Sequence, residues 1–219
     1  MNRTKLINWI IIINISIFSI FWLFFGSHEH GLYKNLIIIS IIPVLLLPTL
    51  LNKFTKFKIE PEIELVYLIF IVLAQFLGGS LNFYYKISFY DKAMHGISGV
   101  MTSILAIVIL VKSKCYKNNP VWVNVLFIIC VTLSVAALWE FFEFINDNIF
   151  SKDAQKVLTT GVDDTMMDMI MAFIGSLIFS VIYIIEKKTN KKGLVVKFAE
   201  KIKWWKVYWK NILFIVYLK

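Results

Sequence analysis

Charged residues are scarce in this chain of 219 residues, where they make up only 17% of the total against 59% hydrophobic residues. A soluble domain of this length could not bury so much apolar surface, so the composition excludes a soluble globular protein. The mean hydropathy of +0.75 points the same way. We therefore expect a lipid bilayer to cover the excess apolar surface.

Cysteine is also rare, with only Cys115 in a predicted loop and Cys130 inside an apolar segment. Their different predicted depths exclude a disulfide, and the absence of a CxxC pair excludes a cysteine-based metal site. The sequence has no GxSxG, HExxH, P-loop or GxGxxG motif. We therefore do not expect a serine hydrolase, a zinc metalloprotease or a nucleotide-binding protein of the common types.

Six long apolar windows predict six transmembrane helices, because about 20 apolar residues cross a hydrocarbon core. The windows cover residues 6–25, 36–51, 63–81, 91–111, 121–146 and 164–185. The first is too long for the core of a signal peptide and no small-x-small cleavage site follows it, so we expect it to be retained. The predicted fold class is all-α, a polytopic six-helix membrane domain in residues 1–186.

The lysines and arginines predict the orientation of this domain. Eighteen of the 23 fall on the side of the two chain ends and five on the other side. Because cytoplasmic loops carry the basic excess, both termini are predicted to be cytoplasmic in a multi-pass protein of the cell membrane. Nine of the fourteen carboxylates and all three histidines fall on the outer side, a bias that the basic residues do not explain.

Residues 187–219 form a basic, tryptophan-rich tail. Lysines interleaved with apolar and aromatic residues are typical of an amphipathic helix in the headgroup region of an anionic leaflet. We therefore expect an interfacial helix with membrane lipids as partners. A nucleic-acid partner is not expected, because the same composition is the normal membrane anchor.

Acidic residues and one histidine recur at the outer ends of the last three predicted helices. Asp91 and His95 are spaced by four residues and so share one helix face, although Asp91 also suits a helix N-cap. Glu140 and Glu143 lie among aromatic residues near the end of the fifth helix, where acidic groups are costly unless they are paired or bind a cation.

The sixth predicted helix carries two more acidic residues on one face. Asp164 is explained equally well as a residue of the first helical turn, whereas Asp168 lies a full turn inside an apolar helix and is a functional candidate by default. Antiparallel helices build metal centres from side chains of this kind. We therefore expect a divalent metal site, for Mg²⁺, Mn²⁺, Zn²⁺ or iron, with the ligands Asp91, His95, Glu140, Glu143, Asp164 and Asp168.

Other outer residues are weaker candidates for the same site. His28, Glu29 and His30 could add ligands, but a short polar loop is more often simply solvated. The predicted cavity lining further includes Gln75, Asn82, Tyr84 and Tyr85.

The three acidic segments carry a family resemblance. Asp91-xxx-His95, Trp139-Glu140-xx-Glu143 and Asp164-xxx-Asp168-xxxxxx-Gly175 resemble the YjdF-type family of uncharacterised bacterial membrane proteins and, more distantly, the VanZ-like proteins associated with glycopeptide resistance. The match covers roughly residues 87–180. Ala172 stands where the VanZ-like pattern has asparagine, which favours the YjdF type. The resemblance implies a bacterial cytoplasmic membrane protein and no particular reaction.

Three functions are compatible with the sequence. The first is a metal-dependent hydrolase or transferase acting on lipid or lipid-linked head groups, with Glu140, Glu143 and Asp168 as catalytic residues. The second is a non-enzymatic lipid- or cation-binding or transport protein, which the apolar inner halves of the fourth and sixth helices disfavour as a conduit. The third is a structural cluster in which the carboxylates pair with Lys86, Lys92 or Lys152.

Overall fold

The structure is a computed structural model that describes residues 2–26, 31–55, 59–189 and 193–201. Within these ranges it contains helices and no strands, and six helices are long and apolar enough to cross a membrane. These are α1 (Arg3–Phe25), α2 (Leu32–Phe54), α3 (Pro61–Ile71) with its continuation η1 (Val72–Ser80), α5 (Tyr90–Lys112), α7 (Val121–Phe150) and α9 (Asp163–Lys188). The predicted six-helix, all-α architecture is confirmed.

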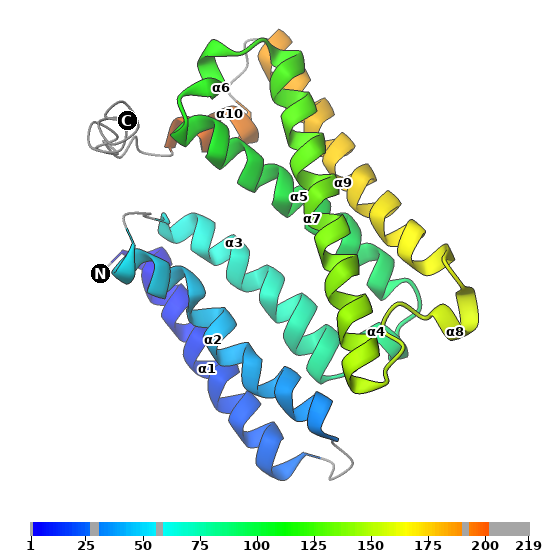
Figure 1. Cartoon of the computed structure of the whole chain (residues 1–219). Helices are drawn as coiled ribbons and strands as arrows, with labels where there is room; N and C mark the ends of the chain where they lie inside the picture. The colour runs from blue at the N-terminus through cyan, green and yellow to red at the C-terminus, as the bar shows by residue number, and fades with distance from the viewer. Residues whose placement is uncertain (1, 27–30, 56–58, 190–192, 202–219) are drawn as a thin grey trace, which may run out of the picture.

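The six helices form two units of three, as Figure 1 shows: α1, α2 and α3 in one, and α5, α7 and α9 in the other. Consecutive long helices run in opposite directions. The short helices α4 (Phe83–Lys86) and α8 (Val157–Thr160) therefore lie at one end of the molecule, and α6 (Cys115–Asn118) lies with the N terminus toward the other. Which end faces the cytoplasm stays a prediction from the lysine distribution.

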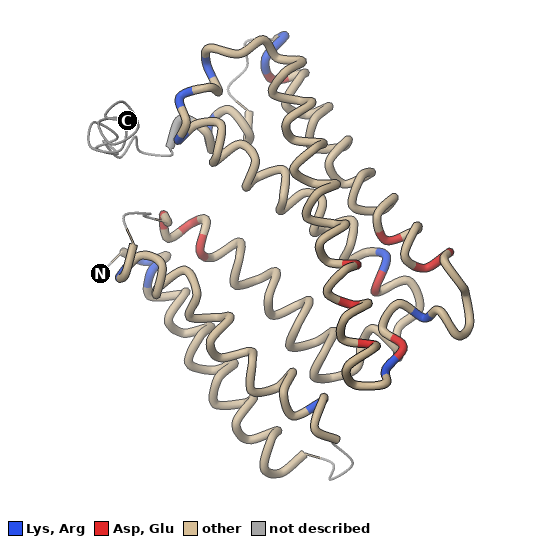
Figure 2. Tube along the Cα trace, in the orientation of Figure 1, with Lys and Arg blue, Asp and Glu red and all other residues tan. Residues whose placement is uncertain are grey.

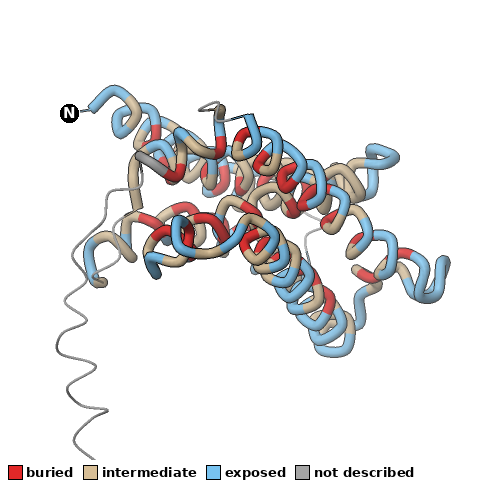
Figure 3. The backbone as a smooth tube through the Cα atoms, turned by 90° about the horizontal axis from the view of Figure 1, so that it is seen from above, coloured by how far each residue is buried: buried red, intermediate tan, exposed pale blue. Residues whose placement is uncertain are grey.

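Each unit has its own apolar core. In the first unit, Ile41 and Leu45 of α2 are fully buried against Leu68 of α3. In the second unit, Ile107 of α5 and Ile128 of α7 are fully buried in the same way. Both units expose many large apolar side chains, which is the expected pattern for helices surrounded by lipid. Figure 3 shows exposed positions along the outer faces of the helices.

Helices α5 and α9 cross so closely that their backbones touch. A methyl group on Gly99 would overlap the carbonyl of Ala172, and one on Gly175 would overlap the carbonyl of Gly96. Small residues permit this approach, and in a bilayer such backbone packing is a main source of helix association. Since the acidic residues lie about one turn before these contacts on both helices, the crossing brings the two acidic faces together.

Two local features differ from the sequence-based expectation. Helix α2 runs through both Pro43 and Pro48 and spans 23 residues, so the proline-containing segment is longer than the predicted 36–51. The last nine residues of the third span form a π-helix, η1. In a π-helix each backbone carbonyl accepts from the N–H five residues later instead of four. The Tyr90 hydroxyl donates to the carbonyl of Leu73 at 2.8 Å, which ties η1 to the start of α5.

The described part of the basic tail is a short helix, α10 (Leu194–Lys201). Val195 and Ala199 are buried against the core of α5, α7 and α9, so this helix packs on the bundle. The Glu186 carboxylate accepts hydrogen bonds from the backbone N–H groups of Val195 and Val196, at 3.2 and 2.8 Å. Residues 202–219, which make up the rest of the predicted interfacial helix 194–219, lie outside the described residues.

The close crossing of α5 and α9 predicts that Gly99→Ala destabilises the protein, because the new methyl group forces the two backbones apart. We expect a loss of about 1–3 kcal/mol, measured as a lower Tm of the detergent-purified protein. Gly96→Ala is the matched control, since its methyl group would lie at an ordinary 3.7 Å from Met171 Cε. Equal Tm values for the two variants would contradict the proposed backbone contact.

Candidate functional site

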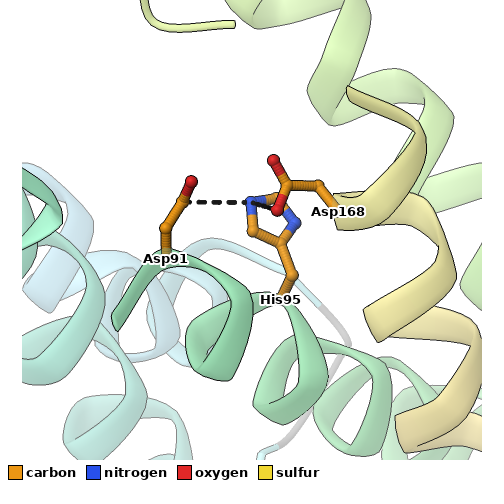
Figure 4. A group of neighbouring side chains, drawn as sticks. All are labelled: Asp91, His95 and Asp168. Carbon is orange, nitrogen blue, oxygen red and sulfur yellow. Dashed lines mark ion pairs between the residues drawn. The ribbon is translucent and has the colours of Figure 1, made fainter. Parts of the chain in front are cut away.

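Asp91, His95 and Asp168 meet where α5 and α9 begin (Figure 4). The His95 imidazole Nε2 lies 3.6 Å from Asp91 Oδ1 and 3.7 Å from Asp168 Oδ1. One potential ligand atom from each residue lies within 4.8 Å of the other two. Asp168 is only 2% exposed, while the other two side chains are partly exposed. The group is thus half-sheltered at the end of the membrane-spanning helices.

Two lysines lie among the carboxylates of this site. The Lys92 ammonium pairs with Asp164 and, at 2.8 Å, with Asp168. The Lys156 ammonium pairs with Asp91 at 2.5 Å and with Asp164 at 3.3 Å. Burial alone would lower the pKa of Lys156, but hydrogen bonds and charges from Asp91 and Asp164 outweigh it and raise the pKa above its ordinary value. Three aspartates and two lysines thus form one network, with a net excess of negative charge.

The segment between α7 and α9 holds Lys156 in place through Asp147. This carboxylate accepts hydrogen bonds from the backbone N–H groups of Ala154 and Gln155, at 2.7 and 3.1 Å. Ser151 and Lys156 adopt left-handed backbone conformations, which turn the chain back toward the bundle. The Asp147 contact therefore fixes a tight connection that points Lys156 at α5 and α9.

Glu140 lies beside the network and is held by Gln155, the neighbour of Lys156. The Gln155 amide donates to Glu140 Oε2 at 3.1 Å, and the same nitrogen lies 3.3 Å from the hydroxyl of Thr165. Glu140 is 5% exposed, and its second oxygen has no hydrogen-bond partner among the described residues. This carboxylate keeps one free acceptor atom next to the site.

Glu143 is more accessible and has a different partner. Its carboxylate accepts a hydrogen bond from the Trp139 indole N–H at 2.9 Å, one turn earlier on α7. Within the described residues, neither Glu143 nor Glu140 forms an ion pair.

Tyr84 of α4 packs against η1 and lies near the same acidic groups. Its ring presses on Gly78, and it contacts the Tyr90 ring edge-on at a centroid distance of 5.5 Å. Burial raises the pKa of the Tyr84 phenol above its ordinary value. Negative charge nearby raises this pKa further, from Asp91, Tyr90, Glu143 and Asp168. A phenol hydroxyl is therefore a further polar group close to the site.

The structure brings the sequence-based candidates together to different degrees. Asp91, His95 and Asp168 form the three-ligand group, Asp164 joins them through the two lysines, and Glu140 and Glu143 lie alongside on α7. His28, Glu29 and His30 lie outside the described residues. Lys156, Gln155 and Asp147 were not predicted from the sequence to be parts of the site. The sequence could have suggested Lys156 as a partner of the acidic residues, because it is one of only five basic residues on the predicted outer side.

The network predicts that Lys92→Met destabilises the metal-free protein strongly, because buried Asp168 loses its lysine partner and Asp164 keeps only Lys156. Breaking a buried pair in this way costs roughly 3–5 kcal/mol, against less than about 1 kcal/mol for an exposed pair. The measurement is the Tm in detergent with a chelator present. Lys86→Met is the control, since Lys86 is exposed and forms no ion pair within the described residues. Equal effects of the two changes would show that the network contributes little.

Comparison with known proteins supports the membrane assignment. A family model described as "Predicted membrane protein (DUF2238)" matches residues 7–189. A Thermotoga maritima protein described as "Uncharacterized protein" is 33% identical over 146 residues, which are 66% of this chain and 72% of that protein. No solved structure matches the chain. Since the family model spans both helical units and the acidic site, the chain belongs to the DUF2238 family of predicted membrane proteins.

Proposed function

We propose that Asp91, His95 and Asp168 bind a divalent metal ion, and that the protein is a membrane-embedded, metal-dependent hydrolase or transferase. The observation that carries the proposal is the distance of 3.6 and 3.7 Å from His95 Nε2 to one oxygen of each aspartate. These two separations are below twice the metal–ligand distance of about 2.1 Å, and one ligand atom from each of the three residues lies within 4.8 Å of the other two, so small side-chain movements bring all three within reach of one ion.

The chemistry of the donors restricts the metal. One imidazole nitrogen with carboxylate oxygens suits Mg²⁺, Mn²⁺, Zn²⁺ or Fe²⁺. Such an ion makes a bound water more acidic or holds a phosphate oxygen. Three protein ligands leave coordination positions open, which is the arrangement of catalytic sites rather than structural ones.

The location of the site indicates the substrate class. The site lies at the ends of helices that are long and apolar enough to span a membrane, which is where lipid head groups are expected. Below it, Ile107, Leu110 and Phe179 lie in the buried core of α5, α7 and α9, which also holds the buried hydroxyl groups of Ser103 and Ser176. The position of the site at the helix ends favours a lipid or lipid-linked head group as substrate.

The remaining acidic residues have roles in this proposal. Glu143 is half-buried and accessible, and we assign it the role of general base. Glu140 Oε1 has no hydrogen-bond partner among the described residues, and we assign this residue as the second carboxylate beside the bound head group. The YjdF-type resemblance groups the same residues but implies no reaction, so the assignment rests on this geometry.

A second candidate function is favoured by Lys92 and Lys156. Their ion pairs satisfy the three aspartates without a metal, so the cluster could serve only to hold the helix ends together. The two alternatives differ in what purification retains. A metal centre keeps its ion, and a structural network does not need one.

The metal proposal predicts about one divalent ion per chain in protein purified in detergent without chelator, measured by elemental analysis. His95→Ala and Asp168→Asn should each lose the ion, because each removes one of three ligands. Asp163→Asn is the matched control, since Asp163 is exposed on the same helix turn as Asp164. Folded wild-type protein that stays metal-free after incubation with Mn²⁺, Mg²⁺, Zn²⁺ and Fe²⁺ would sink the proposal in favour of the structural network.

The enzyme proposal predicts metal-dependent release of a head group from at least one lipid class in a panel of vesicles. Glu143→Gln should lower kcat by about 10²–10⁴-fold, the usual contribution of a general base, while the bound metal is retained. Asp163→Asn should leave kcat unchanged. Metal-loaded protein that releases no head group from phospholipid, glycolipid or polyprenyl-phosphate vesicles would contradict the enzymatic part and leave a metal-binding protein.

A further inference from the structure

A second polar group lies at the opposite end of the molecule, where α1, α2 and α3 meet. The Asn8 amide of α1 donates to Glu64 Oε2 and to the carbonyl of Pro61, both at 2.9 Å. The Thr49 hydroxyl of α2 donates to Glu64 Oε1 at 3.0 Å. Each helix of the first unit thus directs polar atoms at one carboxylate near the start of α3, whose acidic positions Figure 2 shows close to the N terminus.

The Glu64 carboxylate has no cationic partner among the described residues. It is 7% exposed and its hydrogen-bond donors are neutral. Among the basic residues that the structure describes at this end of the molecule, Arg3 and Lys5 are exposed on α1, and the Lys53 ammonium lies over the Phe54 ring at 5.3 Å. Glu64 lies in the first turn of α3, where the helix dipole offsets only part of the cost of burying a carboxylate, so a compensating positive charge is still favourable.

An orphaned oxygen lies beside the same carboxylate. Asn8 is 1% exposed, and its Oδ1 has no hydrogen-bond partner among the described residues. A half-turn of the Asn8 amide exchanges the positions of its nitrogen and oxygen. Oδ1 then lies where the nitrogen now is, between Glu64 and the carbonyl of Pro61. Glu60, one turn before Glu64, also has a buried oxygen without a partner. Buried oxygen atoms of this kind are normally satisfied by a donor or a cation.

We propose that Asn8, Thr49 and Glu64 form a binding site for a monovalent cation of the Na⁺ type. The available donors are all oxygen: two from the carboxylate, one hydroxyl, one amide and the carbonyl of Pro61. Hard oxygen sets of carboxylate, hydroxyl and main-chain carbonyl are how membrane proteins coordinate Na⁺. One buried carboxylate balances one positive charge, whereas a divalent ion would leave an excess charge in a medium of low dielectric constant.

The site is separate from the metal proposal and uses none of its residues. The bound cation links all three helices of the first unit, so occupancy stabilises that unit. It also removes the uncompensated charge that Glu64 otherwise keeps inside the bundle. The expected consequence is a protein whose stability depends on Na⁺ beyond the general effect of salt.

The test is the Tm of the full-length, detergent-purified protein in NaCl and in choline chloride at equal ionic strength. Na⁺ should raise the Tm by something on the order of 5 °C at saturation, with a hyperbolic dependence on concentration. Glu64→Gln keeps the size of the side chain and should abolish the Na⁺-specific rise. Glu62→Gln is the matched control, since Glu62 is exposed on the same helix, and should keep it.

The wild-type protein alone makes the proposal falsifiable even if Glu64→Gln does not fold. Equal Tm values for the wild type in NaCl and choline chloride would overturn the cation site. A Tm that depends on pH and not on Na⁺ would also overturn it. A Na⁺-specific rise that persists in Glu64→Gln would place the cation elsewhere and equally refute the assignment.

Discussion

The backbone contact between α5 and α9 is the constraint on which the acidic site depends. Gly99 lies against Ala172 and Gly175 against Gly96 without intervening side chains, so the backbones of the two helices are in direct contact. Asp91 and His95 lie one or two turns before the contact on one helix, and Asp168 lies one turn before it on the other. A larger residue at Gly99 or Gly175 would separate the same atoms that a shared metal ion has to reach.

Electrostatic balance is the second determinant of the site. The helix crossing concentrates Asp91, Asp164 and Asp168 at one point, and Lys92 and Lys156 offset two of the three charges. One carboxylate charge remains, together with Glu140 and Glu143 alongside. The network is therefore not electrically neutral, and its excess negative charge beside His95 favours the binding of a cation.

The sequence predicted the fold well because the bilayer imposes simple rules. Apolar windows of sufficient length fixed the six spans, and alternation of the lysines grouped the acidic helix ends on one side, so Asp91, His95 and Asp168 could be placed together before the structure was known. The π-helix of Val72–Ser80 was not predictable, because its backbone is stabilised by distant groups such as the Tyr90 hydroxyl. Lys156 and Gln155 were missed because a connecting segment carries them, and only the Asp147 contacts determine where that segment lies.

The most direct test of the metal proposal is pulsed electron paramagnetic resonance of Mn²⁺-loaded protein, which detects nitrogen nuclei bound to the ion. The account predicts one imidazole nitrogen coupled to Mn²⁺, lost in His95→Ala and retained in a variant with both His28 and His30 changed to alanine. Bound Mn²⁺ without nitrogen coupling, or coupling that survives His95→Ala, would contradict the assignment of Asp91, His95 and Asp168 as the metal ligands.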